Sequence, residues 1–209
     1  MYEISQDMML LIFFVVSFGV LSMLNDKFSH SNQIKYNQFA DTRRICCIPN
    51  FLDVVSNIIF VIGGLYNYDK PIIMLCSILV AFGSTWFHIN PTMNTLVFDR
   101  IPMILFLTYI VGYKLHWEIT NQLIFTFIGL LTIAYWMCTY DIIPYSTFQI
   151  APLLFFAIYG EYGMRIPVLL YVFAKICEDN DRCIYELTNN IISGHTLKHL
   201  FAGCSLFFI

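Results

Sequence analysis

The chain has 209 residues, of which 58% are hydrophobic and 12% are charged, and its formal net charge is −3. Soluble domains have about 45–50% apolar and about 25% charged residues, so this composition excludes an ordinary soluble domain and indicates a single domain in a membrane. The small negative charge provides no basic surface, which excludes nucleic acid as a partner.

Apolar runs long enough to cross a bilayer recur along the whole chain. Crossing the hydrocarbon core takes close to 20 residues, with about 17 as the lower limit. Since backbone polar groups in lipid must be satisfied within each segment, we expect an all-α, polytopic bundle of up-and-down helices joined by short turns. The candidate spans are 8–24, 51–66, 71–89, 96–113, 121–139, 145–160, 164–187 and 190–209.

The first and seventh runs need separate interpretation. The run at 8–24 is predicted to be an anchor helix rather than a signal peptide, because MYEISQD has no positive charge and no A-x-A cleavage site follows. The run at 164–187 is apolar only in its first half. Its second half either leaves the bilayer or faces the protein interior, because it carries Lys175, Glu178, Asp179, Asp181 and Arg182.

The polar loop at 25–49 predicts the orientation of the bundle. It holds Lys27, Lys35, Arg43 and Arg44, whereas the connections on the opposite side carry one basic residue each. Because basic loops favour the cytoplasmic side, we expect this loop in the cytoplasm and, with eight spans, both termini on the other side.

Seven cysteines are scattered along the chain, mostly in or beside apolar runs and with no CxxC pair. An odd number without regular spacing argues against a disulfide framework and against a thiolate zinc site. The cysteines are therefore expected to be small buried hydrophobic residues, which leaves any metal to histidine and carboxylate ligands.

Five polar residues lie inside the predicted spans, namely Ser84, His88, Asp99, His195 and His199. Ionisable groups at membrane depth are costly and usually functional. Spacing of four residues places Ser84 with His88, and His195 with His199, on one face of a helix. If the spans alternate in direction and 164–187 crosses the membrane, all five residues lie at one depth on one side.

Three histidines from two helices match a catalytic zinc site, which leaves a fourth position for water. Zinc lowers the pKa of bound water towards about 7; Asp99 could orient or deprotonate this water, and Ser84 could donate a hydrogen bond to an oxyanion. Taken singly, each motif has a structural interpretation: a polar helix end for HxxxH, helix packing for Ser84, and a local ion pair for Asp99-Arg100. Only the complete set favours zinc.

The motifs GSTWFH (83–88), DRIPM (99–103) and HTLKH (195–199) resemble those of the alkaline ceramidase family, within a superfamily of seven-helix membrane hydrolases. The stretches FADTRRICCIPNFLDVVSN (39–57) and ISGHTLKHL (192–200) look more like an uncharacterised branch of that family, and the similarity covers about residues 36–205. The resemblance implies a zinc site of His88, His195 and His199 with Asp99 and Ser84 beside the metal.

The same resemblance implies a domain organisation: an additional N-terminal anchor helix (1–24), a polar loop (25–49) and a seven-helix catalytic domain (50–209). Two positions depart from the family pattern. Arg100 stands where the family has an acid, and Asn50 stands where the animal ceramidases have a calcium-binding glutamate. Asp41 and Asp53 could supply oxygen ligands, but these departures argue against calcium and weaken the assignment of ceramide as substrate.

The leading hypothesis is therefore an integral-membrane zinc amidohydrolase that cleaves a ceramide-like lipid into a sphingoid base and a fatty acid, with its site near the cytoplasmic side. Two alternatives stay open: a non-enzymatic receptor or scaffold stabilised by zinc, and a lipid ester hydrolase of the same superfamily. A metal transporter would need further polar residues along several helices, and none lies at the opposite depth.

Overall fold

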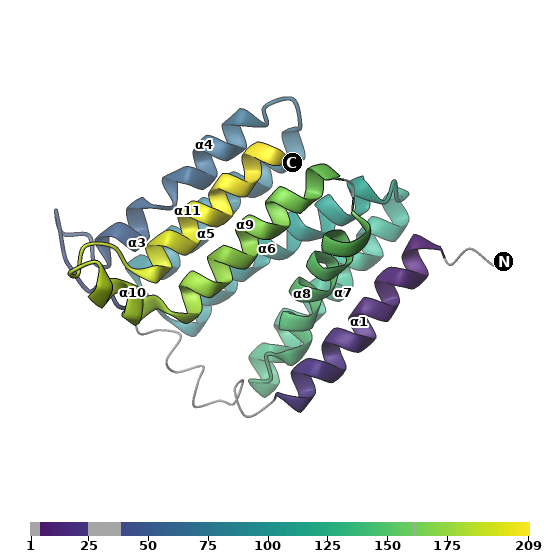
Figure 1. Ribbon diagram of the computed structural model, residues 1–209, viewed down its shortest axis with the longest axis horizontal. Coiled ribbons are helices and arrows are strands. Elements are labelled where there is room, and N and C mark those ends of the chain that lie inside the picture. Colours follow the sequence, from purple (N-terminus) through teal and green to yellow (C-terminus); the bar gives the residue numbers. More distant parts are fainter. Residues whose placement is uncertain (1–4, 25–38, 161) are drawn as a thin grey trace. The chain divides into compact units, whose positions relative to one another are not determined.

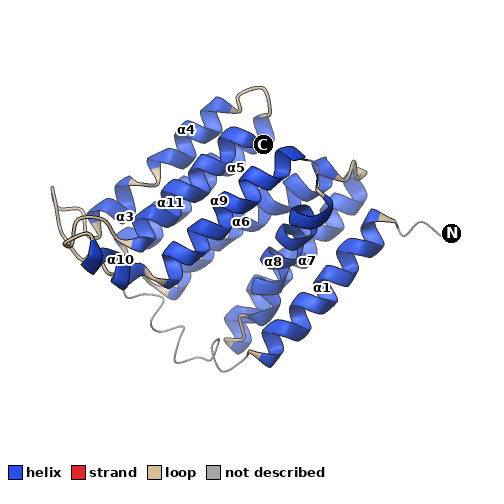
Figure 2. Cartoon of the chain, in the orientation of Figure 1, coloured by secondary structure: helices blue, strands red, loops and turns tan. Residues whose placement is uncertain are grey.

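The structure is a computed structural model that describes residues 5–24, 39–160 and 162–209. Within these ranges the chain forms helices joined by turns and contains no β-strand, as Figure 2 shows. Strand-like pairing in these ranges is limited to an isolated bridge between Ile45 and Ile48. The all-α class expected from the sequence is confirmed.

The described chain divides into two compact units. Unit 1 holds residues 5–24 and 104–160, and unit 2 holds residues 39–103 and 162–209. The division falls within one long helix, α6, so that its first half belongs to unit 2 and its second half to unit 1.

Unit 1 is built from aromatic and aliphatic side chains. Its first helix begins at Ser5, whose hydroxyl accepts a hydrogen bond from the amide of Met8 and so caps the helix. This helix packs along α8, and the ring of Phe148 contacts those of Phe14 and Phe125 at centroid distances of 5.6 and 4.6 Å. The helices of unit 1 are α1 (Gln6–Met23), the second half of α6 (Met93–Lys114), α7 (Ile119–Thr139) and α8 (Ile143–Tyr159) (Figure 1).

Unit 2 is a bundle in which the C-terminal helix packs against helices from both halves of the sequence. α11 contacts α9 and α4, and α4 contacts α5. Its elements are α3 (Phe51–Val55), α4 (Ile58–Tyr66), α5 (Pro71–Ile89), the first half of α6, α9 (Tyr162–Asp179), α10 (Asp181–Leu187), α11 (Gly194–Cys204) and η2 (Ser205–Phe208) (Figure 1).

In the part of the chain that the structure describes, four helices are long and apolar enough to cross a membrane: α1, α5, α6 and α7. The segments Phe51–Tyr66 and Ile143–Tyr159 are apolar but shorter. These helices are consistent with a membrane protein.

Two of the predicted spans are interrupted in the structure. The run 51–66 is split into α3 and α4 at Ser56-Asn57, where the side chains of both residues hydrogen-bond to the carbonyl of Asp53 and so compete with the helical pattern. The run 164–187, expected as one crossing, is two helices, because α9 ends at Asp179 and α10 begins at Asp181.

The polar loop and the cysteines agree with the predictions only in part. Residues 25–38 of the predicted loop 25–49 lie outside the described residues, and 39–49 form no helix. All seven cysteines are free, as expected, but only Cys76 and Cys177 are buried. The expectation of general burial was wrong for Cys46, Cys47, Cys138 and Cys183, which are exposed on the protein surface. The division into 1–24, 25–49 and 50–209 stays a prediction.

Candidate metal centre

Three histidines meet in the interior of unit 2. His88 lies in the last turn of α5, and His195 and His199 lie in the first turns of α11. One nitrogen from each ring lies within 4.8 Å of the others, and all three side chains are buried. The residues come from segments more than a hundred positions apart in the sequence, so this cluster exists only in the folded chain and could bind a metal ion.

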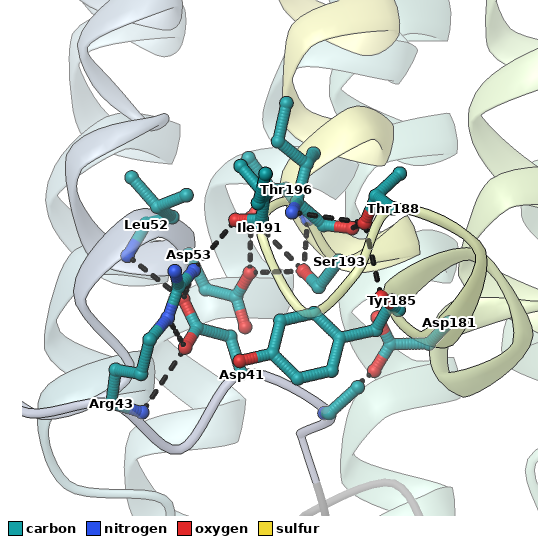
Figure 3. Close-up of polar contacts among 12 residues, drawn as sticks. Asp41, Arg43, Leu52, Asp53, Asp181, Tyr185, Thr188, Ile191, Ser193 and Thr196 are labelled. Carbon is teal, nitrogen blue, oxygen red and sulfur yellow. Dashed lines mark hydrogen bonds and ion pairs between the residues drawn. The ribbon is translucent and has the colours of Figure 1, made fainter.

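The start of α11 is held in place by buried polar contacts. Ser193 is its N-cap and accepts a hydrogen bond from the amide of Thr196. The hydroxyls of both residues donate to Oδ1 of Asp53, at 2.7 and 2.6 Å, which joins α11 to α3 (Figure 3). The amide of His195 donates to the carboxylate of Asp181 at 2.7 Å. Asp53 and Asp181 therefore fix the register in which α11 presents its histidines.

Gly194 allows α11 to approach α9 closely. A β-carbon at this position would collide with the backbone carbonyl oxygen of Cys177 and with the backbone of Asp181. No flexible side chain could move aside to relieve these contacts, so the position needs glycine.

A short loop before α3 closes this end of the unit. Asp41 is fully buried and accepts hydrogen bonds from the Arg43 guanidinium at 2.7 and 2.9 Å and from the amide of Leu52 (Figure 3). Arg43 also donates to the carbonyl of Ile191. Burial alone would raise the pKa of Asp41, but the hydrogen bonds and the charge of Arg43 outweigh it and lower this pKa below its ordinary value.

The imidazole of His199 is oriented by a hydroxyl on a neighbouring helix. Its Nδ1 lies 2.8 Å from Oγ of Ser56, which in turn donates to the carbonyl of Asp53. A partner on one ring nitrogen sets the tautomer and leaves the other free to bind a metal. Here Nε2 is the nitrogen left for the cluster.

The donor set fits a metal ion of the zinc type. Nδ1 of His88 is buried and has no hydrogen-bond partner among the described residues, which is costly unless a metal or water completes the site. Zinc–nitrogen bonds of about 2.0–2.1 Å place two ligand nitrogens roughly 3.4 Å apart. The observed limit of 4.8 Å is therefore within reach of small side-chain movements.

Aromatic rings line the cluster. Phe39 lies 4.5 Å from the ring of His88 and 5.2 Å from that of His195, and Phe60 lies 6.0 Å from His199. These apolar walls keep bulk water from the imidazoles, so the local dielectric is low and a bound charge would be felt strongly.

The other two predicted site residues lie beside the histidines. Ser84 Oγ is 3.4 Å from Nε2 of His199, and the side chains of Ser84 and Asp99 are close enough to interact as hydrogen-bond partners. Both are buried. Their helices come together at Gly83, where a β-carbon would collide with the carbonyl oxygen of Phe98. All five residues expected from the sequence therefore lie together, while the roles of Ser84 and Asp99 stay predictions.

The two departures from the family pattern occupy different places. Asn50 adopts a left-handed backbone conformation with φ of 46°, which asparagine tolerates well. Its amide donates to the carbonyl of His88 at 2.8 Å, so it supports the last turn of α5, which carries His88. Arg100 is buried next to Asp99.

A calcium site at Asp41 and Asp53 stays without support. Both oxygens of Asp41 are already occupied by Arg43 and Leu52. Among the described residues, the histidine cluster is the one place where three or more potential metal ligands lie close together.

Three contacts beside the cluster were not anticipated from the sequence: the hydrogen bond of Ser56, the covering ring of Phe39, and an ion network around the buried carboxylate of Glu178. In this network Lys198 and Lys175 each bond to one oxygen of Glu178 at 2.6 Å. Lys198 lies between the two predicted ligands of the motif HTLKH. This position in the sequence is the signal that could have indicated that Lys198 lies near the cluster.

No protein-family model, curated protein or solved structure matches the chain. The class of protein therefore follows from the fold and the site alone. In its described part it is an all-helical protein with four helices long and apolar enough to span a membrane and a buried three-histidine cluster that could bind a metal.

Proposed function

We propose that the chain is a zinc-dependent membrane amidohydrolase that cleaves a ceramide-like lipid into a sphingoid base and a fatty acid. The observation that carries the proposal is the cluster of His88, His195 and His199 with Ser84 and Asp99 beside it. Three histidine ligands leave one coordination position for water or substrate, as in catalytic zinc sites, whereas structural sites are closed by four protein ligands. This favours an enzyme over a zinc-stabilised scaffold.

The chain's own residues supply the remaining parts of an amide hydrolysis. Bound zinc would activate a water molecule and polarise the carbonyl oxygen. Asp99 takes a proton from the water as it adds to the acyl carbon, and the Ser84 hydroxyl donates a hydrogen bond to the oxygen on which negative charge develops. The C–N bond then breaks, the acyl carbon keeps the hydroxyl of water, and the departing nitrogen receives the proton.

The test is turnover of a labelled ceramide by purified protein in detergent or lipid nanodiscs. We expect release of fatty acid that stops on chelation and returns when zinc is added back. Asp99→Asn should reduce kcat by at least about 100-fold, the contribution typical of a general base, while zinc content stays at the wild-type level. Stoichiometric zinc without turnover of any lipid amide or ester would favour the scaffold alternative.

The ester alternative is separated in the same assay. A labelled lipid ester with the same acyl chain presents the same carbonyl to the site but a better leaving group. Turnover of the ester with none of the amide would replace the amidohydrolase by an ester hydrolase and would leave the metal site unchanged.

A further inference from the structure

An apolar groove of about 350 Å³ lies in unit 2 between the segment α3–α4 and helix α5. Val54 and Ala81 are buried at its floor, whereas Val55, Ile58 and Phe82 are exposed at its rim. Ligand sites in proteins commonly have volumes of about 300–1,000 Å³ and are mostly apolar, with a few polar groups that orient the ligand. The groove therefore has the size and composition of a site for a small apolar ligand.

The break between α3 and α4 separates this groove from the histidine cluster. Ser56 lies 2.8 Å from the ring of His199, whereas the next residue, Asn57, lines the groove. None of the lining residues is one of the five predicted site residues. The two consecutive side chains thus serve different places, and the groove is distinct from the candidate metal centre.

Asn57 brings an unused hydrogen-bond acceptor to the groove. Its side chain is only 1% exposed, and its Nδ2 donates to the carbonyls of Asp53 and Val54 at 2.9 and 3.3 Å. Since only the amide nitrogen can donate to two carbonyl oxygens, the orientation of the side-chain amide is fixed. Oδ1 is then left buried without a hydrogen-bond partner among the described residues. A buried acceptor of this kind is costly unless a donor reaches it from outside the chain.

Thr85 is the other polar residue of the lining and belongs to the opposite wall, on α5. Its hydroxyl can both donate and accept a hydrogen bond. The remaining lining side chains are apolar, and none of the lining residues is ionisable. A charged ligand would therefore enter the groove without a counter-charge, which is expensive. The lining favours a neutral ligand with an apolar body and a hydrogen-bond donor.

The walls of the groove belong to apolar helices. α5 is long and apolar enough to cross a membrane, and Phe51–Tyr66 is a shorter apolar segment. Phe82 is 68% exposed at the rim, so in a membrane the groove faces hydrocarbon, where water does not satisfy polar groups. The donor for Asn57 must then come from a lipid. The ester groups of phosphatidylcholine only accept hydrogen bonds, whereas an amide N–H or a hydroxyl donates one.

We propose that the groove between α3–α4 and α5 is a binding site for a neutral lipid whose amide N–H or hydroxyl donates a hydrogen bond to Oδ1 of Asn57. The hydrocarbon chain of this lipid lies against Val54 and Ala81. The site goes beyond the proposed function, because lipid binding there requires neither zinc nor hydrolysis.

The test is photo-cross-linking of the purified protein in nanodiscs of phosphatidylcholine. The probes are N-dodecylacetamide, dodecyl acetate and dodecanol, each with a diazirine in the middle of the dodecyl chain. The amide and the acetate differ only in N–H against O. We expect the amide to label residues 54–61 and 81–85 at least about fivefold more than the acetate, which corresponds to one buried hydrogen bond. Mass spectrometry of the labelled peptides gives the measurement.

The alcohol distinguishes the two donors. Stronger labelling by dodecanol than by the amide would identify a hydroxyl lipid as the ligand, and the reverse order would identify a lipid amide. Equal labelling of the groove by all three probes would show that no donor is selected and would overturn the proposal. Labelling spread evenly over all the apolar helices would overturn the site itself.

Variants then locate the selectivity. Asn57→Leu removes the acceptor at similar volume, so the ratio of amide to acetate labelling should fall to about one, while the acetate still labels the groove. Because this change also removes the bonds to Asp53 and Val54, Ala81→Leu is the second variant. It fills the floor, leaves Asn57 in place and should abolish labelling of the groove by all three probes.

Ala134→Leu is the matched control for the filled groove, because it adds the same side chain at an exposed position of α7 in unit 1. It should leave the labelling of the groove at the wild-type level. An unchanged ratio in Asn57→Leu, or unchanged labelling in Ala81→Leu, would overturn the proposal.

Chelation separates the groove from the metal centre. Protein stripped of zinc should show the same labelling of 54–61 and 81–85 and the same preference for the donor probes, because no histidine lines the groove. Loss of this labelling on chelation would place the lipid at the metal centre and overturn the separate site. A lack of lipid hydrolysis would instead sink the proposed function and leave the labelling of the groove unaffected.

Discussion

The two units of the chain bury different kinds of polar residue. In the described part of unit 1 the buried polar side chains are all neutral: Ser17, Thr108, Thr147 and Gln149. Gln149 donates to the hydroxyl of Tyr145, and Thr126 donates to Thr108. Unit 1 therefore follows the ordinary pattern for helices that pack in an apolar environment, with neutral hydrogen bonds between close neighbours.

Unit 2 also buries neutral polar side chains, but it buries ionisable groups in addition: the histidine cluster, the acids Asp41, Asp53 and Asp99, and Arg100. Such groups are costly in a low dielectric and persist only where they are paired, bind a metal or act in chemistry. The comparison teaches that the candidate metal site and the costly buried charges are confined to unit 2 among the described residues. The predictions below test that difference, from the largest expected effect to the smallest.

Removal of a metal ligand should have the largest effect. We expect His199→Ala to reduce bound zinc from about one per chain to less than about a tenth, because loss of a direct ligand exceeds the 10–100-fold cost of losing an outer-shell partner. The readout is elemental analysis of purified protein. His116→Ala, which removes an exposed histidine of unit 1, is the control and should bind zinc normally. Wild-type zinc content in His199→Ala would show that His199 is not a zinc ligand.

Loss of the buried carboxylate that holds α11 should come next. Asp53→Ala deprives the hydroxyls of Ser193 and Thr196 of their acceptor, and hydrogen bonds to a charged group contribute about 1.5–3 kcal/mol each. We expect a loss of about 3 kcal/mol in the free energy of unfolding, measured by detergent titration. Thr126→Val in unit 1 removes a neutral bond and should cost about 1 kcal/mol or less. Equal losses would contradict the contrast between the units.

Loss of the hydroxyl that orients His199 should weaken metal binding without abolishing it. Ser56→Ala removes the partner of Nδ1, and we expect zinc affinity to fall by about 10–100-fold. Competition with a chelator of known affinity measures the change. Ser77→Ala is matched to it, since Ser77 is also buried but donates to the carbonyl of Ile73 in its own helix. A similar loss in both variants would point to general destabilisation.

The smallest predicted effect concerns acid stability. The pKa of Asp41 is lower in the folded protein than its ordinary value of 3.8, so the ionised form stabilises the fold at neutral pH. This contribution is complete above the unfolded-state pKa and is lost as pH falls through it towards the lower folded-state pKa. We expect the melting temperature of Asp41→Asn to be lower at pH 7 and to fall less steeply below pH 4 than that of the wild type.

The exposed Asp69 provides the control for acid stability, because it lies in the turn before α5 away from Arg43. Asp69→Asn should leave the steepness of the acid limb at the wild-type value. Parallel acid limbs for the wild type and Asp41→Asn would show that the ion pair with Arg43 contributes nothing to acid stability.

Much of the helical architecture could be predicted, because apolar runs and turn formers are local signals. The run at 71–89 coincides with α5, and Asn90-Pro91 marks its end. The breaks that split the predicted helices 51–66 and 164–187 at Ser56-Asn57 and Asn180 were missed, because they depend on the hydrogen bonds that polar side chains form in the folded chain. Ser56 is used by His199 on another helix, and no local pattern encodes that contact.

The sequence by itself determined which residues could form a site. Polar and ionisable side chains are costly to place in an apolar environment. The two histidines four positions apart, and the serine and aspartate within apolar runs, can therefore be recognised as candidates without knowing how the helices pack. Only the tertiary structure decided which atoms meet. In the folded chain Ser56 orients the ring of His199, and the ring of Phe39 packs against that of His88. Lys198 lies beside His195 and is bonded to Glu178. Orientation, covering and charge balance depend on packing between helices distant in the sequence, and for that reason they cannot be read from spacing alone.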